Sequence, residues 1–208
     1  MKIENIKPDQ IEAKSFEIIG EILGDKELDP RYEAVIKRCI HTSADFEYAD
    51  SMYFTDGVID KIQEAIKKGA YIVTDTTMAR AGINKKRIEK YGGDVLCFIG
   101  DEDVAAEAKE RGVTRSLVSM EKASRLDRPV IFAIGNAPTA LISIYDLVKA
   151  GKLSPVAVIG VPVGFVNVVE SKELLIGSGV PCIAARGRKG GSNIAAAIVN
   201  AIQYKIEE

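Results

Sequence analysis

The hydrophobic and polar positions of this chain form two alternating patterns. Short apolar runs rich in β-branched residues, typical of strands buried on both faces, alternate with longer segments whose apolar residues recur at helical spacing. The short runs predict five strands, at residues 70–75, 94–100, 129–135, 155–160 and 181–187. The longer segments predict helices at residues 56–69, 102–112, 137–151 and 190–208.

The order of these elements predicts the fold class. Strand, helix and strand in repetition are the signature of parallel strands joined by crossover helices, which cover both faces of the sheet. We therefore expect an α/β protein, a three-layer doubly wound parallel sheet of the flavodoxin-like type. Two N-terminal helices, at about 8–22 and 30–43, precede the sheet. The second begins where Asp29 can cap it and Pro30 can occupy its first turn.

Composition and charge narrow the class of protein. The 208 residues contain no linker, repeat or low-complexity tract, so residues 1–208 are predicted to form a single domain. A formal charge of -2 lacks the positive field of a general nucleic-acid binder. No run approaches the roughly 20 apolar residues of a membrane-spanning helix, and the N-terminus lacks the apolar core of a signal peptide. We expect a cytoplasmic protein with no nucleic-acid or membrane partner.

Cysteine and histidine usage argues against a metal site. Cys39, Cys97 and Cys182 are far apart and form no CxxC pair, so they indicate neither a disulfide framework nor a thiolate metal site. The chain has one histidine, which is too few for the usual transition-metal sites. We interpret the three cysteines as small buried hydrophobic residues.

Candidate chemistry lies in the loops after the predicted strands, because ligands of open parallel sheets bind beyond the carboxyl ends of the strands. Glycine, proline and hydroxyl or amide side chains concentrate in these loops, at 75–82, 135–141, 160–167 and 186–193. No loop matches GxxxxGK[ST] or GxGxxG, so a nucleotide-binding relative of flavodoxin has no specific support.

The loop "RGRKGGSN" is the most basic of these segments. Arg186, Arg188 and Lys189 precede an alanine-rich helix, and cations beside a helix N-terminus suit a phosphate or a carboxylate. The other interpretation is that Gly190 and Gly191 only turn the chain and that the cations are solvated.

Two further loops also have two interpretations each. In "GNAPTAL", Asn136 can cap a helix that has Pro138 in its first turn, or Asn136 and Thr139 can donate to a ligand. In "GVPVGFVN", the apolar side chains either belong to the core or line a hydrophobic pocket, and the following "ESKE" indicates the start of a helix with a polar surface.

His41, in "RCIHTSADFEYAD", is the only histidine, and it lies near the C-terminus of a predicted helix. One interpretation is a helix-end histidine, stabilised by the helix dipole and paired with a carboxylate such as Asp45. The other is a proton donor, because the unperturbed pKa of histidine lies close to neutral pH.

Five strings, taken together and in order, resemble the precorrin-8X methylmutase family of cobalamin biosynthesis, including its cobalt-precorrin-8 counterpart. They are "CIHTSADFEYAD", "TDTTMARAGI", "AIGNAPTAL", "IGVPVGFVNVVESKE" and "RGRKGGSNIAAAIVNA". The resemblance implies an isomerase that moves a methyl group from C-11 to C-12 of a corrinoid precursor, giving hydrogenobyrinate or cobyrinate. It also implies a flavodoxin-like homodimer that needs no cofactor and no external methyl donor.

The resemblance assigns roles to particular residues. His41 matches the family's catalytic histidine, and as a general acid it would protonate a ring nitrogen and make the conjugated system electron-poor. Spacing, and not the resemblance, suggests Asp45 as a partner that is close enough in sequence to orient or charge the imidazole. The expected substrate is a carboxylate-rich tetrapyrrole, for which arginine is a favoured partner. The predicted substrate-binding residues are Ser15, Thr42, Arg115, Asn136, Arg186, Arg188 and Lys189.

Two alternatives stay open at this point. Ser15 matches a hydroxyl position near the family's site, but it is equally interpreted as an exposed helix residue. The whole chain is alternatively a non-catalytic carrier that sequesters an anionic tetrapyrrole, because the same arginines would serve both functions. Turnover separates the enzyme from the carrier.

Overall fold

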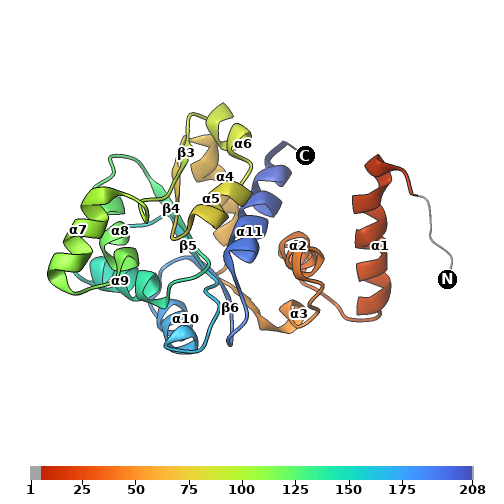
Figure 1. The fold of residues 1–208 in the computed structure, drawn as a ribbon. Helices are drawn as coiled ribbons and strands as arrows, with labels where there is room; N and C mark the ends of the chain where they lie inside the picture. Colours follow the sequence, from red (N-terminus) through yellow and green to blue (C-terminus); the bar gives the residue numbers. More distant parts are fainter. Residues whose placement is uncertain (1–5, 208) are drawn as a thin grey trace.

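The computed structural model describes residues 6–207, and these residues form a six-stranded sheet between two layers of helices (Figure 1). The strands are β1 (Met52–Phe54), β2 (Tyr71–Thr74), β3 (Asp94–Leu96), β4 (Val130–Ile134), β5 (Ala157–Gly160) and β6 (Cys182–Ala185). Five parallel strands lie side by side in the order β3–β2–β4–β5–β6, and β1 pairs antiparallel with β6 at the edge. Because β2 and β3 exchange places relative to their order in the chain, this is the flavodoxin-like strand order. The predicted fold class is confirmed.

Helices cover both faces of the sheet (Figure 1). One face carries α2 (Glu33–Ser43), α4 (Val58–Lys67), α5 (Thr77–Gly82), α6 (Lys85–Lys90) and α11 (Ser192–Tyr204). The other carries α8 (Arg115–Ala123), α9 (Pro138–Lys149) and α10 (Val168–Ile176), with α7 (Glu102–Arg111) packed on α8. Along β4, Ile131 joins the first hydrophobic cluster and Phe132 the second, because successive side chains of a strand point to opposite faces.

The N-terminal part lies outside these layers. A short turn of 3-10 helix, η1 (Pro8–Gln10), leads into α1 (Ile11–Leu23), which packs against α2 at the side of the molecule (Figure 1). α3 (Tyr48–Ser51) joins α2 to β1, and η2 (Lys205–Glu207) follows α11. Within residues 6–207, no helix combines the length and the apolar character that crossing a membrane requires.

The five predicted strands are all present, but two details of the sheet differ from the sequence prediction. The predicted strand 94–100 ends at Leu96. The sequence pattern does not predict β1, because its three half-buried residues are too few to form a recognisable apolar run.

Local hydrogen bonds explain two differences in the helices. The predicted loop 75–82 contains α5, because the hydroxyl of Thr76 accepts the N–H of Ala79 (3.1 Å) and so caps a helix there. α2 begins at Glu33 instead of Pro30, because the Asp29 carboxylate accepts the N–H of Arg31 (2.9 Å) and closes a turn before the helix. The helices α6 and α8 are also additions to the sequence prediction.

Candidate active site

The carboxyl edge of the sheet contains a point where the strand order reverses, between β2 and β4. Asp75, which directly follows β2, is buried there (1% exposed). Its carboxylate accepts the backbone N–H groups of Gly135 (2.9 Å), Asn136 (2.8 Å) and Ala137 (2.7 Å), all from the loop after β4. Burial raises the pKa of the Asp75 carboxyl, whereas the three N–H donors favour its charged form. Asp75 therefore fixes the backbone of the loop after β4.

The structure contradicts one of the two interpretations of Asn136, that of a helix cap. The N-cap residue of α9 is Ala137, which makes no side-chain cap, and Pro138 occupies the first turn as predicted. Asn136 has its backbone tied to Asp75 and its side chain exposed to solvent. It remains available as a donor to a ligand.

The loops after β2 and β4 pack closely against the start of α11. A Cβ placed on Gly135 would lie 2.6 Å from the Cα of Ser192, so only glycine lets the loop after β4 approach α11 this closely. The hydroxyl of Thr76, which follows β2, lies 2.7 Å from the hydroxyl of Ser192. The loops after β2, β4 and β6 therefore converge at the N-terminus of α11.

Residues 186–191, which we call the cationic loop, join β6 to α11. The Arg186 guanidinium is paired with Glu173 (2.7 Å), and Lys189 is paired with Asp45 (2.6 Å) and Glu47 (2.5 Å). Within the described part of the chain, Arg188 is the only cation of the loop without a carboxylate partner. Its guanidinium donates to the carbonyl of Phe165 (2.9 Å) and lies over the Phe165 ring (5.6 Å).

His41 lies in the last turn of α2, as predicted, with its side chain exposed. Its ring stacks on Phe16 of α1, with 5.3 Å between centroids and 21° between planes. The expected pairing of Asp45 with His41 is wrong: the Asp45 carboxylate instead binds Lys189 and accepts the N–H of Glu47 (3.0 Å). The Lys189 ammonium lowers the pKa of Asp45. This ion pair links the His41 segment to the cationic loop, so residues far apart in sequence share one region.

The remaining predicted substrate-binding residues, Ser15, Thr42 and Arg115, lie on α1, α2 and α8. Ser15 is on α1 beside Phe16, and its hydroxyl donates to the Ile11 carbonyl (2.8 Å), as a helix-surface serine often does. Thr42 is exposed next to His41.

Arg115 is exposed at the first position of α8. The preceding Thr114 donates to Thr139 in the first turn of α9 (3.0 Å), which places Arg115 near the carboxyl edge. No bond between described residues joins Arg115 to His41 or to the cationic loop.

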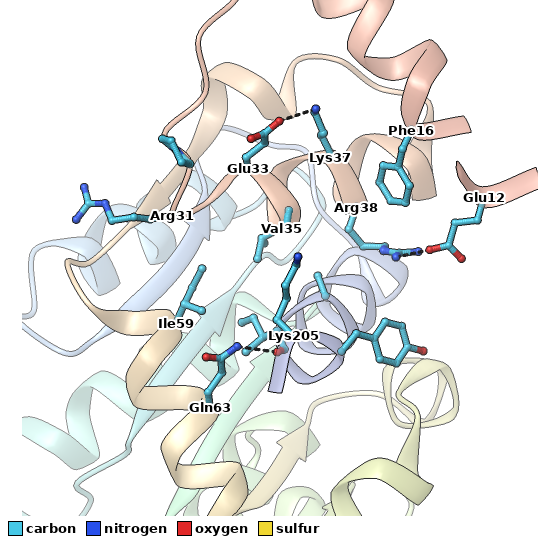
Figure 2. Close-up of a pocket in the computed structure, with 15 residues that line it drawn as sticks. Glu12, Phe16, Arg31, Glu33, Val35, Lys37, Arg38, Ile59, Gln63 and Lys205 are labelled. Carbon is cyan, nitrogen blue, oxygen red and sulfur yellow. Dashed lines mark hydrogen bonds and ion pairs between the residues drawn. The ribbon is translucent and has the colours of Figure 1, made fainter. Parts of the chain in front are cut away.

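A cavity of about 690 Å³ lies elsewhere, between α1, α2, α4 and the end of α11 (Figure 2). Its charged side chains include the pairs Glu33–Lys37 and Glu12–Arg38, which Figure 2 shows joined. The loops converge at Ser192, but the cavity is lined by Ala201, Ile202, Tyr204 and Lys205, about 14 to 20 Å away along the helix direction. None of the predicted site residues lines this cavity, so it is not the site assembled at the carboxyl edge.

Sequence reasoning missed two buried charged residues of the site, Asp75 and Lys172. Lys172 is fully buried (0% exposed), and its ammonium donates to the carbonyls of Gly187 (2.9 Å) and Lys189 (2.8 Å). Burial lowers the pKa of Lys172 to about 8. A signal existed in the helical spacing, because Lys172 shares one face of α10 with the buried Val168 and Leu175.

Fold and site together define a class: a flavodoxin-like α/β protein whose strand-end loops form a basic edge beside one exposed histidine. Comparison with known proteins narrows that class to a family. The family model for precorrin-8X methylmutase matches residues 10–205. The chain belongs to the precorrin-8X methylmutase family.

Individual relatives agree with this assignment over nearly their whole length. The cobalt-precorrin-8 methylmutase of Priestia megaterium is 47% identical, over 95% of this chain and 88% of its own. That of Salmonella typhimurium is 43% identical, over 97% of each chain. The crystal structure of a precorrin-8X methylmutase from Thermus thermophilus has a TM-score of 0.86 and 34% identity, covering 95% of this chain and 98% of that one. The protein is therefore an isomerase, a methylmutase of cobalamin biosynthesis.

Proposed function

We propose that the protein moves a methyl group from C-11 to C-12 of precorrin-8X or cobalt-precorrin-8, with His41 as the general acid. The products are hydrogenobyrinate and cobyrinate. The observation that carries the proposal is the position of the only histidine, exposed at the end of α2 and linked to the cationic loop through the Asp45–Lys189 pair. A proton donor and a binding region for anionic side chains thus occur together.

The proposed reaction requires only a proton donor and a binding region for the substrate. The bond from the methyl carbon to C-11 breaks and the bond to C-12 forms within one molecule, so neither a nucleophile nor a methyl donor takes part. Protonation of a ring nitrogen by His41 makes the conjugated system electron-poor and assists the shift. Because reactant and product are isomers, the proton returns to the imidazole when the product forms. No cofactor is required.

Substrate binding follows from the charges at the carboxyl edge. Arg188 is the first candidate for a substrate carboxylate, because its charge is not already neutralised by a described side chain. Arg186 and Lys189 contribute after exchanging their present carboxylate partners, and Arg115 binds a more distant carboxylate. Ser15, Thr42 and Asn136 supply hydrogen bonds.

We also propose that the protein works as a homodimer. α1 packs mainly on α2 and leaves Ile11, Ile18 and Ile22 exposed (52%, 42% and 61%), and a second copy would cover such a face. Sedimentation velocity at micromolar concentration should give a mass of two chains, and Ile18→Glu with Ile22→Glu should shift it to one. A wild-type mass of one chain would contradict the dimer.

Incubation of the purified protein with precorrin-8X, and separately with its cobalt form, tests the proposed reaction. Many product molecules per protein, identified after release, support the enzyme. A stoichiometric change in the absorption spectrum that reverses on dissociation would instead support a carrier. S-adenosylmethionine should neither raise the rate nor transfer label, and label transfer would contradict an intramolecular shift.

A further inference from the structure

We propose that Lys172 is a positioning residue that shapes the cationic loop into a main-chain binding site for one carboxylate. By holding loop carbonyls inward, Lys172 leaves the N–H groups of Gly187, Arg188, Lys189 and Gly190 to receive the anion. That this carboxylate belongs to a corrinoid rests on the proposed function. The shape of the loop is independent of that identification.

The environment of Lys172 is the first observation. Its side chain is fully buried beneath the loop, and two of its three N–H donors bind the carbonyls of Gly187 and Lys189. No carboxylate among residues 6–207 pairs with it. Burying a charge without an opposite partner is costly, so a buried lysine held only by carbonyls indicates a requirement for its charge or for those bonds.

The backbone of the loop is the second observation. The carbonyls of Gly187 and Lys189 bind Lys172, and the carbonyl of Arg188 accepts the N–H of Gly164 (3.2 Å). By contrast, the N–H groups of residues 187–190 donate to no atom in the described part of the chain. The flanking N–H groups are both used, since Arg186 donates to Ser51 (2.8 Å) and Gly191 donates to Val161 (2.9 Å). Four free donors therefore lie between two anchored ones.

Successive free N–H groups in a turn form a concave site that binds anions. Two glycines allow the loop to adopt this path. Gly187 has φ 81°, a left-handed conformation that glycine adopts without strain. A Cβ on Gly190 would lie 2.1 Å from the Val161 carbonyl oxygen, so only glycine permits this contact.

The charges around the loop favour an external carboxylate at this site. Glu173, Asp45 and Glu47 are already paired with side chains of the loop. The free N–H groups belong to a loop whose carbonyls contact the buried Lys172 ammonium and whose Arg188 is exposed to solvent. An incoming carboxylate thus finds hydrogen-bond donors and positive charge together.

The test compares Lys172→Met, which keeps the length of the side chain without its charge, with Lys172→Arg, which keeps the charge. The matched control is Lys149→Met, which removes an exposed charge at the end of α9, away from the loop. We expect Lys172→Met to raise KM and the Kd of hydrogenobyrinate about 10- to 100-fold, the range for weakened hydrogen bonds to a charged ligand, with kcat changed less than about threefold. Lys172→Arg should recover part of the loss, and Lys149→Met should have no effect. A folded Lys172→Met protein with wild-type KM and Kd would overturn the proposal.

A second measurement on the wild-type protein covers the case in which Lys172→Met does not fold. In ¹⁵N-labelled protein, the amide resonances of residues 187–190 should move downfield when hydrogenobyrinate is added, more than those of Arg186 and Gly191. Unmoved resonances at saturation would overturn the site while leaving the proposed reaction intact. A failure of the proposed function would show differently, as absence of conversion with both forms of the substrate.

Discussion

At the scale of single residues, the histidine of the candidate site is not paired with a carboxylate. The ring of His41 stacks on Phe16, and its nitrogens hydrogen-bond to none of the described residues. The carboxylate of Asp45 neutralises Lys189 instead. No described side chain therefore blocks the imidazole nitrogens, as the proposed role of His41 requires.

Replacing His41 by Asn tests the proton transfer directly. Asn still donates a hydrogen bond but cannot deliver a proton, so the single-turnover rate should fall about 100- to 10,000-fold. The Kd of the product should stay within a few-fold of the wild-type value, because the cations and N–H groups that bind carboxylates are unchanged. Near-normal conversion by folded His41→Asn protein would show that His41 is not the acid.

The arginines of the cationic loop should differ in importance. Arg188→Ala removes a cation without a carboxylate partner and should weaken product binding about tenfold or more at low ionic strength. Arg186→Ala removes a cation paired with Glu173 and should weaken binding less than about fivefold. Titrations with the product at two salt concentrations measure both losses of affinity, and added salt should reduce them because exposed charges are screened. Equal losses for the two substitutions would contradict the greater importance of Arg188.

At the scale of elements, buried polar side chains define the loops at the carboxyl edge. Asp75 fixes the loop after β4 from the end of β2, and Lys172 fixes the loop after β6 from within α10. In both cases one charged group binds several backbone atoms of a neighbouring loop. The positions of the exposed Asn136 and Arg188 therefore depend on two side chains that are buried from solvent.

Asp75→Asn tests the first of these supports. An amide offers one acceptor oxygen in place of two, so at least one buried N–H of residues 135–137 loses its partner. The free energy of unfolding should fall by about 1–3 kcal/mol, measured by urea denaturation. Asp146→Asn, an exposed substitution on α9, is the control and should change it little. A fully stable Asp75→Asn protein would show that these bonds contribute nothing.

At the scale of the whole molecule, α11 connects two regions of different character. The strand-end loops converge on its first residue, Ser192, and the 690 Å³ cavity lies at its other end. A buried charge beneath the cationic loop opposes the stability of the whole fold. With a pKa of about 8, Lys172 is still mostly charged at neutral pH, and burying this charge lowers the stability of the folded state.

Stability should therefore depend on pH through Lys172. Its pKa is about 8 in the folded protein and 10.5 in the unfolded chain, so between these values the unfolded chain binds the extra proton. The free energy of unfolding of the wild type, relative to Lys172→Met, should rise by about 2 kcal/mol from pH 7 to pH 10. Urea denaturation of both proteins at several pH values measures this difference. A constant difference would contradict the assigned cost of burial.

The five parallel strands, the longer helices between them, the flavodoxin-like class and the family could be predicted from the sequence, because periodicity and long matching strings are properties of the chain. The short elements β1, α3, α5 and α6, and the helix α8, could not. The sequence also indicated the strand-end loops as the ligand side, since parallel strands share one carboxyl edge. Which charged groups pair with one another could be seen only in the three-dimensional structure. Asp45 binds Lys189 instead of His41, and Lys172 of the polar "ESKE" segment is buried. These partners lie on different elements of the chain. The packing of the elements fixes the distances between them, and local sequence patterns contain no information on that packing.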